Sequence, residues 1–95
     1  MHTPEWFEKE EICEYLDSIG AWYCKPYMAG YGKRGVPDIV ACINGRFVGI
    51  EVKREGGVLT MLQLRRLEAI GAAGGGVVWG TAEKVIGEIK AHRAK

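Results

Sequence analysis

The dipeptide Asn44-Gly45 limits the fold of this chain more than any other feature, because apolar runs lead up to it and away from it. Asn-Gly between two such runs is the strongest short-range signal of a β-hairpin with a two-residue type I′ turn. The predicted strands cover residues 39–43 and 46–54. Both faces of this hairpin are largely apolar, which indicates strands in the middle of a sheet that is covered on both sides.

The register set by this turn places two acidic residues opposite each other. Counting outwards from the turn, Asp38 pairs with Glu51. Residues opposed in this way have Cβ atoms about 4.5–5.5 Å apart and share one face of the sheet. Lys53, two residues beyond Glu51, lies on that face as well. Two carboxylates this close repel each other, and a bound divalent cation would remove the repulsion.

A pair of carboxylates beside a lysine has the composition of a site that hydrolyses phosphodiester bonds. Asp38 and Glu51 supply the hard oxygen ligands that Mg²⁺ prefers, and the backbone carbonyl of Val52 lies between them. Lys53 is expected to orient or deprotonate the attacking water, or to stabilise charge on phosphorus. The alternative is a surface ion pair between Lys53 and Glu51, the commoner role of an isolated Glu-x-Lys. The apolar strand faces favour the metal site, because charged side chains among them are energetically costly unless they serve a function such as metal binding.

The rest of the chain predicts helices and strands around this hairpin. Thr3-Pro4 begins a helix, and the capping box Thr60-x-x-Gln63 begins another. The first helix directs Ile12, Leu16 and Ile19 inwards, and the second directs Leu64, Leu67 and Ile70 inwards. Besides the hairpin, the predicted elements are therefore these two helices, over residues 4–19 and from residue 60 to about 70, a strand over 21–28, a strand over 77–79 and a last helix capped by Thr81. The order α-β-β-β-α-β-α predicts an α/β fold with a small mixed sheet flanked by helices, whose last strand pairs in parallel.

Charge is unevenly distributed along the chain. Residues 1–20 contain six acids and one lysine, whereas residues 25–54 contain six basic residues against two acids. The basic excess surrounds the predicted site, where a polyanion would have to dock.

The segment Gly30–Gly35 matches G-x-G-x-x-G by letter, but it leads into a proline and a strand, so it is no dinucleotide fingerprint. We expect a loop whose Lys33 and Arg34 contact phosphates, the alternative being an ordinary hairpin loop. Of the aromatic residues, Tyr27 and Tyr31, in the predicted loop over residues 27–36, are reasonable contacts to bases, and most of the others are expected in the core.

Length and cysteine content limit the remaining choices. Ninety-five residues predict a single domain over 1–95, small enough to gain stability from dimerisation. No apolar run has the length of a membrane span. Three widely spaced cysteines without a C-x-x-C indicate neither a zinc site nor a disulfide framework, which favours an intracellular protein.

The run GYGKRGVPDIVACINGRFVGIEVKREGGVLTMLQ resembles a VRR-NUC domain, a branch of the PD-(D/E)xK nuclease superfamily. The motifs that carry the resemblance are G-V-P-D, I-E-V-K, the T-x-x-Q helix start and an Ala-Gly-Gly before the last strand. The resemblance implies a restriction-endonuclease-like fold and hydrolysis of DNA with Mg²⁺ or Mn²⁺. Carried over by position, it implies that Asp38 and Glu51 bind metal, Lys53 is the catalytic lysine and Gln63 is the motif glutamine. Gln63 would then share this role with helix capping.

The family also carries a glutamate on the first helix. The start Thr3-Pro4-Glu5 resembles the family's, so Glu5 is the predicted third ligand and Glu8, one turn further, the second choice. Free-standing members resemble phage and bacterial homodimers that act on branched DNA such as four-way junctions, so we expect DNA and a second copy as partners, inside a bacterium or a phage-infected host. Arg54 is a further expected DNA contact. The alternatives are a non-catalytic module that binds structured nucleic acid and a small protein-interaction domain.

Overall fold

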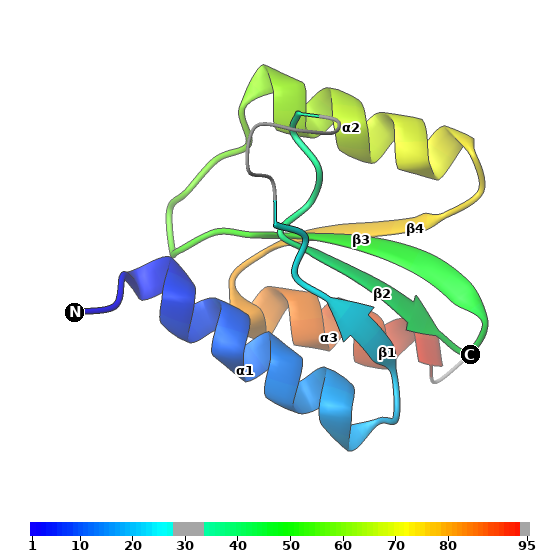
Figure 1. Ribbon diagram of the computed structural model, residues 1–95, viewed down its shortest axis with the longest axis horizontal. Coiled ribbons are helices and arrows are strands. Elements are labelled where there is room, and N and C mark those ends of the chain that lie inside the picture. Colours follow the sequence, from blue (N-terminus) through cyan, green and yellow to red (C-terminus); the bar gives the residue numbers. More distant parts are fainter. Residues whose placement is uncertain (28–33, 94–95) are drawn as a thin grey trace.

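The computed structural model describes residues 1–27 and 34–93, and its helices and strands follow the predicted order α-β-β-β-α-β-α. Figure 1 shows them as two helical layers around one sheet. The elements are α1 (Pro4–Ser18), β1 (Trp22–Cys24), β2 (Ile39–Ile43), β3 (Arg46–Val52), α2 (Met61–Ala72), β4 (Gly76–Gly80) and α3 (Ala82–Arg93). No described helix is both long enough and apolar enough to cross a membrane.

The hairpin of β2 and β3 has the predicted turn and register. Asn44 and Gly45 both have positive φ, 52° and 80°, as a type I′ turn requires. The strands pair Cys42 with Phe47 and Val40 with Gly49. The ladder ends at residues 39 and 50, so residue 38 enters β2 directly opposite residue 51.

The sheet has the order β1-β2-β3-β4, with antiparallel pairing between the first three strands and parallel pairing between β3 and β4. The predicted parallel strand is therefore confirmed. The first strand is shorter than the predicted 21–28, because only Trp22–Cys24 pair with β2. Pro26 has no N–H to donate to a neighbouring strand, which accounts for the early end, and Met28 lies outside the described residues.

One face of the sheet forms the main core with α1 and α3, which lie together below the sheet in Figure 1. The inward residues of β2 and β3 alternate as predicted, and all except the half-buried Val48 are almost fully buried. The core comprises Ile12, Cys13, Leu16, Ile39, Ala41, Ile43, Ile50, Val52, Val78, Ala82, Val85 and Ile89.

The opposite face is covered only in part, which corrects the prediction of a sheet buried on both sides. Helix α2 packs against β3 and β4, so closely that a Cβ on Gly49 would lie 2.9 Å from Ile70 Cδ1. Among the described residues no helix covers this face over β1 and β2, and a cross-strand row of Trp22, Cys42 and Phe47, which runs from β1 to β3, is exposed. Trp22 is 66% exposed, so it is not among the aromatic residues that reach the core.

The predicted inward set of α2 needs a smaller correction. Leu67 is buried, but Leu64 is 38% exposed. The narrow contact between α2 and the two strands beneath it accounts for this, because it has room for only one line of apolar side chains.

Candidate active site

Asp38 and Glu51 meet where β2 begins and β3 ends. The Asp38 carboxylate accepts a hydrogen bond from the Val52 amide through Oδ2, at 2.9 Å. This bond ties the residue before β2 to the last residue of β3 and fixes the direction of the Asp38 side chain. Glu51 is only 2% exposed, so a carboxyl group is enclosed beside that side chain.

Burial dominates the acid–base chemistry of Glu51. Removal from water and, after it, the neighbouring Asp38 carboxylate raise the pKa of Glu51 from 4.5 to about 8. The positive charges of Lys53 and Lys9 oppose this rise. Without a metal ion, Glu51 is therefore largely protonated at neutral pH.

Gln63 combines two roles at the start of α2. Its backbone N–H donates to Thr60 Oγ1 at 3.1 Å, and its Oε1 accepts from the Thr60 N–H at 2.9 Å, which completes the predicted capping box. Its Nε2 donates to Glu51 Oε1 at 3.3 Å. The cap holds the amide in a fixed place, and the amide in turn orients the Glu51 carboxyl group.

Lys53 follows β3 directly. Its backbone N–H donates to the Gly80 carbonyl at 2.8 Å, which continues the pairing of β3 with β4 for one more residue. The half-buried side chain lines a hollow of about 620 Å³, together with Arg54, Trp79 and Lys84. Lys84 places its ammonium 4.2 Å from the centre of the Trp79 ring. The predicted catalytic lysine thus lines an open space and lies near enough to Glu51 for its charge to act on that carboxyl group.

The donor atoms here fit a hard divalent cation. Glu51 Oε2 is buried and has no hydrogen-bond partner, an arrangement that is unfavourable unless something else binds that oxygen. Asp38 supplies a second carboxylate, and oxygen donors are what Mg²⁺ and Mn²⁺ prefer. Within residues 1–27 and 34–93, however, no three His, Cys, Asp or Glu side chains gather at one point. The described carboxylates at this site are therefore a pair.

The first helix brings a lysine to this pair. Lys9 Nζ lies 3.7 Å from Asp38 Oδ1. Glu8 points elsewhere, because its Oε1 accepts a hydrogen bond from the Ala82 N–H at 2.8 Å and so caps α3. Glu5 lies half-buried one helical turn before Lys9, on the same side of α1, without joining a group of three acids. Lys9 was not among the predicted site residues, although it is the one lysine among the acids of α1.

The role of Glu8 as the cap of α3 can be tested by mutation, with Glu11 as the control. Glu8→Ala should lower the free energy of unfolding by about 1 kcal/mol, because the first N–H groups of α3 lose a charged acceptor. Glu11→Ala, at an exposed position of the same helix, should change it by less than about 0.5 kcal/mol. Urea unfolding at pH 7 measures both, and equal losses in the two variants would contradict the assignment.

The predicted DNA contacts are only partly described. Arg34 and Arg54 are exposed, and Arg66 donates from Nε to the Arg34 carbonyl at 2.6 Å, which fixes that end of the loop against α2. Lys33 and Tyr31 lie outside the described residues.

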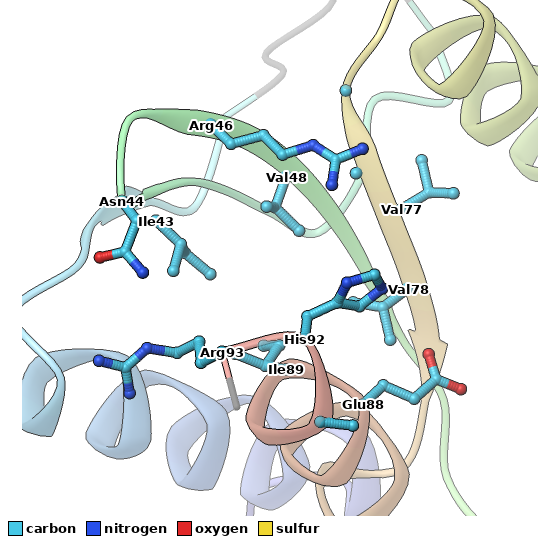
Figure 2. A pocket seen from close by; sticks show the side chains of 13 residues that line it. Ile43, Asn44, Arg46, Val48, Val77, Val78, Glu88, Ile89, His92 and Arg93 are labelled. Carbon is cyan, nitrogen blue, oxygen red and sulfur yellow. The ribbon is translucent and has the colours of Figure 1, made fainter. Parts of the chain in front are cut away.

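A second hollow, of about 590 Å³, lies at the other end of β3. Figure 2 shows Arg46, His92 and Arg93 around its rim and apolar side chains such as Val48 and Val78 at its base. Its lining includes none of the predicted catalytic or metal-binding residues, and Glu88 is the one acid in the described lining. Without a carboxylate pair it lacks the chemistry of the Asp38–Glu51 site.

No protein-family model and no curated protein matches the chain. Five chains of solved structures are similar to it, and two of them are the following. One, described as a VRR_NUC domain, has a TM-score of 0.80 and 24% identity over 96% of this chain and 98% of that one. The other, the Holliday junction resolvase Hjc from the archaeal hyperthermophile Archaeoglobus fulgidus, has a TM-score of 0.58 and 23% identity over 78% of this chain and 63% of that one. The predicted restriction-endonuclease-like fold is confirmed.

Proposed function

We propose that this chain, which has the fold of a VRR_NUC domain, is a metal-dependent endonuclease that hydrolyses phosphodiester bonds in DNA. One observation carries the proposal: a buried Glu51 carboxyl group, with one oxygen unpartnered, lies against the carboxylate of Asp38. A buried acid pair is destabilising by itself, and such pairs are found where function requires them. The cofactor is Mg²⁺ or Mn²⁺, because the available donors are oxygens.

Each site residue has its own role in the proposed hydrolysis. Asp38, Glu51 and the Val52 carbonyl hold the metal ion, with Glu5 as the proposed further ligand. Gln63 keeps the Glu51 carboxyl group in one orientation through its 3.3 Å contact. Lys53 orients the attacking water or stabilises the negative charge that develops on the phosphate. When bound, the metal ion supplies positive charge to the phosphate and makes water more acidic.

The proposed substrate is branched DNA, such as a four-way junction. The support is the fold shared with Hjc, a Holliday junction resolvase. Exposed Arg34 and Arg54 lie on the two segments that flank the hairpin and are proposed to contact the backbone, with Lys33 and Tyr31 of the loop. Because four-way junctions form where DNA is copied and repaired, the proposal includes an enzyme that acts inside a cell.

Cutting a junction symmetrically takes two active sites, so we propose a homodimer. The exposed row of Trp22, Cys42 and Phe47 is an apolar surface that a second copy would cover. Sedimentation equilibrium of the full chain tests this, and a monomer at micromolar concentration would contradict it.

The test of the function compares four-way junction, supercoiled and linear DNA, each with Mg²⁺, Mn²⁺, Ca²⁺ or EDTA. We expect cleavage with Mg²⁺ or Mn²⁺, fastest on the junction, and none with EDTA. Cleavage that persists in EDTA would contradict metal dependence. No cleavage of any DNA by the wild-type chain would contradict the proposed activity.

The alternative is a non-catalytic module that binds structured nucleic acid. The contact between Lys9 and Asp38 favours this alternative, because it gives the acid a structural partner without metal. This alternative predicts tight, salt-sensitive junction binding that is unchanged by EDTA and by Asp38→Asn, together with no cleavage.

A further inference from the structure

Lys9 occupies the side of the Asp38 carboxylate that the protein backbone leaves open. The Val52 amide takes Oδ2, whereas the Lys9 ammonium lies 3.7 Å from Oδ1. Both side chains are partly shielded from solvent, with exposed fractions of 32% for Lys9 and 26% for Asp38. An ion pair in this setting is screened less by water and salt than a pair on the open surface.

The same ammonium also acts on Glu51, because its charge favours the ionised form of that carboxyl group. Lys9 therefore does electrostatically, with one positive charge, what a bound divalent cation would do with two. The ammonium and a metal ion would compete for the same carboxylate, because Asp38 Oδ1 cannot interact fully with both at once. The positive charge of Lys9 would also repel a metal ion bound to Asp38.

We infer that Lys9 is a built-in competitor of the metal ion: it neutralises Asp38 in the metal-free protein, must give up that carboxylate when a divalent cation binds, and so weakens metal affinity. The inference rests on the proposed metal site at Asp38 and Glu51. In this role Lys9 is a positioning residue that keeps the acid pair stable until metal is bound. It limits occupancy of the site to conditions in which the divalent cation is abundant.

A second ion pair, between α1 and the segment that follows β1, supplies the control. Lys25 Nζ lies 3.2 Å from Glu10 Oε2, with exposed fractions of 50% and 39%. Lys25 is not among the charges that shift the pKa of Glu51. Removing this lysine takes away the same charge and the same type of contact, but away from the acid pair.

The test measures Mn²⁺ binding to the full chain by isothermal titration calorimetry at pH 7, without DNA. Lys9→Met should bind Mn²⁺ about three- to tenfold more tightly than the wild type, the range expected for loss of a partly shielded ion pair. Lys9→Arg keeps the charge and should stay within about twofold, as should Lys25→Met. A second measurement, the rise in melting temperature on adding Mn²⁺, should be larger for Lys9→Met than for the wild type. Lys9→Gln repeats the test if the methionine variant folds poorly.

The outcomes separate this inference from the proposed function. Unchanged or weaker Mn²⁺ binding by both neutral variants, with wild-type binding and DNA cleavage intact, overturns the role of Lys9 alone. Equal tightening in Lys25→Met also overturns it, because a general charge effect would then explain the result. Absence of Mn²⁺ binding by the wild type, together with absence of cleavage, overturns both.

Discussion

Replacing Lys53 by methionine should slow DNA cleavage by about 10²–10⁴-fold, the range for loss of a positioned acid–base or charge-stabilising group. The backbone of Lys53 keeps its bond to the Gly80 carbonyl, and methionine fills a similar volume, so the fold should persist. The free energy of unfolding should change by less than about 0.5 kcal/mol. Mn²⁺ binding should also persist, because Lys53 contributes no ligand. Single-turnover cleavage of a labelled junction measures the rate.

Lys84→Met is the matched control, since Lys84 lines the same hollow and is exposed. It should retain cleavage within about threefold, apart from an effect on DNA affinity. Asp38→Asn should lose both cleavage and Mn²⁺ binding, which distinguishes a metal ligand from the lysine. Full activity in Lys53→Met would contradict the proposed role of the lysine, even if the metal site is real.

The sequence predicted the hairpin and the acid pair because both depend on local rules. A type I′ turn requires two residues with positive φ, and Asn44 with Gly45 meets that requirement at little cost. Once the turn is fixed, the period of two along each strand determines which residues share a face. The Thr60 capping box is local for the same reason, so Gln63 could be placed at the start of α2.

The surroundings of the pair depend on how elements distant in the sequence dock. Glu8 and Ala82 are 74 residues apart, and only the contact between α1 and α3 makes one cap the other. The same docking turns Lys9, and not Glu8, towards Asp38. Nothing local distinguishes one of the six acids on α1 from the others as a ligand. The single lysine among them carries no local signal of a place at the site either.

The uncovered half of the sheet has a similar cause. Apolar residues on both faces of β2 and β3 predict cover on both sides, but they do not say how far a helix extends across the sheet. Helix α2 covers β3 and β4 alone, and Phe47 stays 49% exposed beside the open strands.

The metal-free protein should become less stable as pH rises from about 5 to 8. The pKa of Glu51 is about 8 in the fold and near 4.5 in the unfolded chain, so across this window the folded state holds a proton that the unfolded state has lost. The contribution of Glu51 to stability is complete below pH 4.5 and is lost as pH approaches the folded pKa. One such group changes the free energy of unfolding by at most about 1.4 kcal/mol per pH unit. Urea unfolding in EDTA between pH 5 and 9 measures the slope.

Glu51→Gln isolates this effect from every other titrating group, because glutamine stays neutral while it keeps similar size and hydrogen bonding. Subtracting the variant from the wild type should leave a stability difference that grows by a few kcal/mol in favour of the variant towards pH 8. The variant should bind no metal. For the wild type, saturating Mn²⁺ should reverse the trend, because the metal ion binds the ionised carboxylate and gains affinity as pH rises. Parallel pH profiles for the wild type and Glu51→Gln would show that Glu51 is ionised throughout, and the acid pair would then be stable without a metal ion.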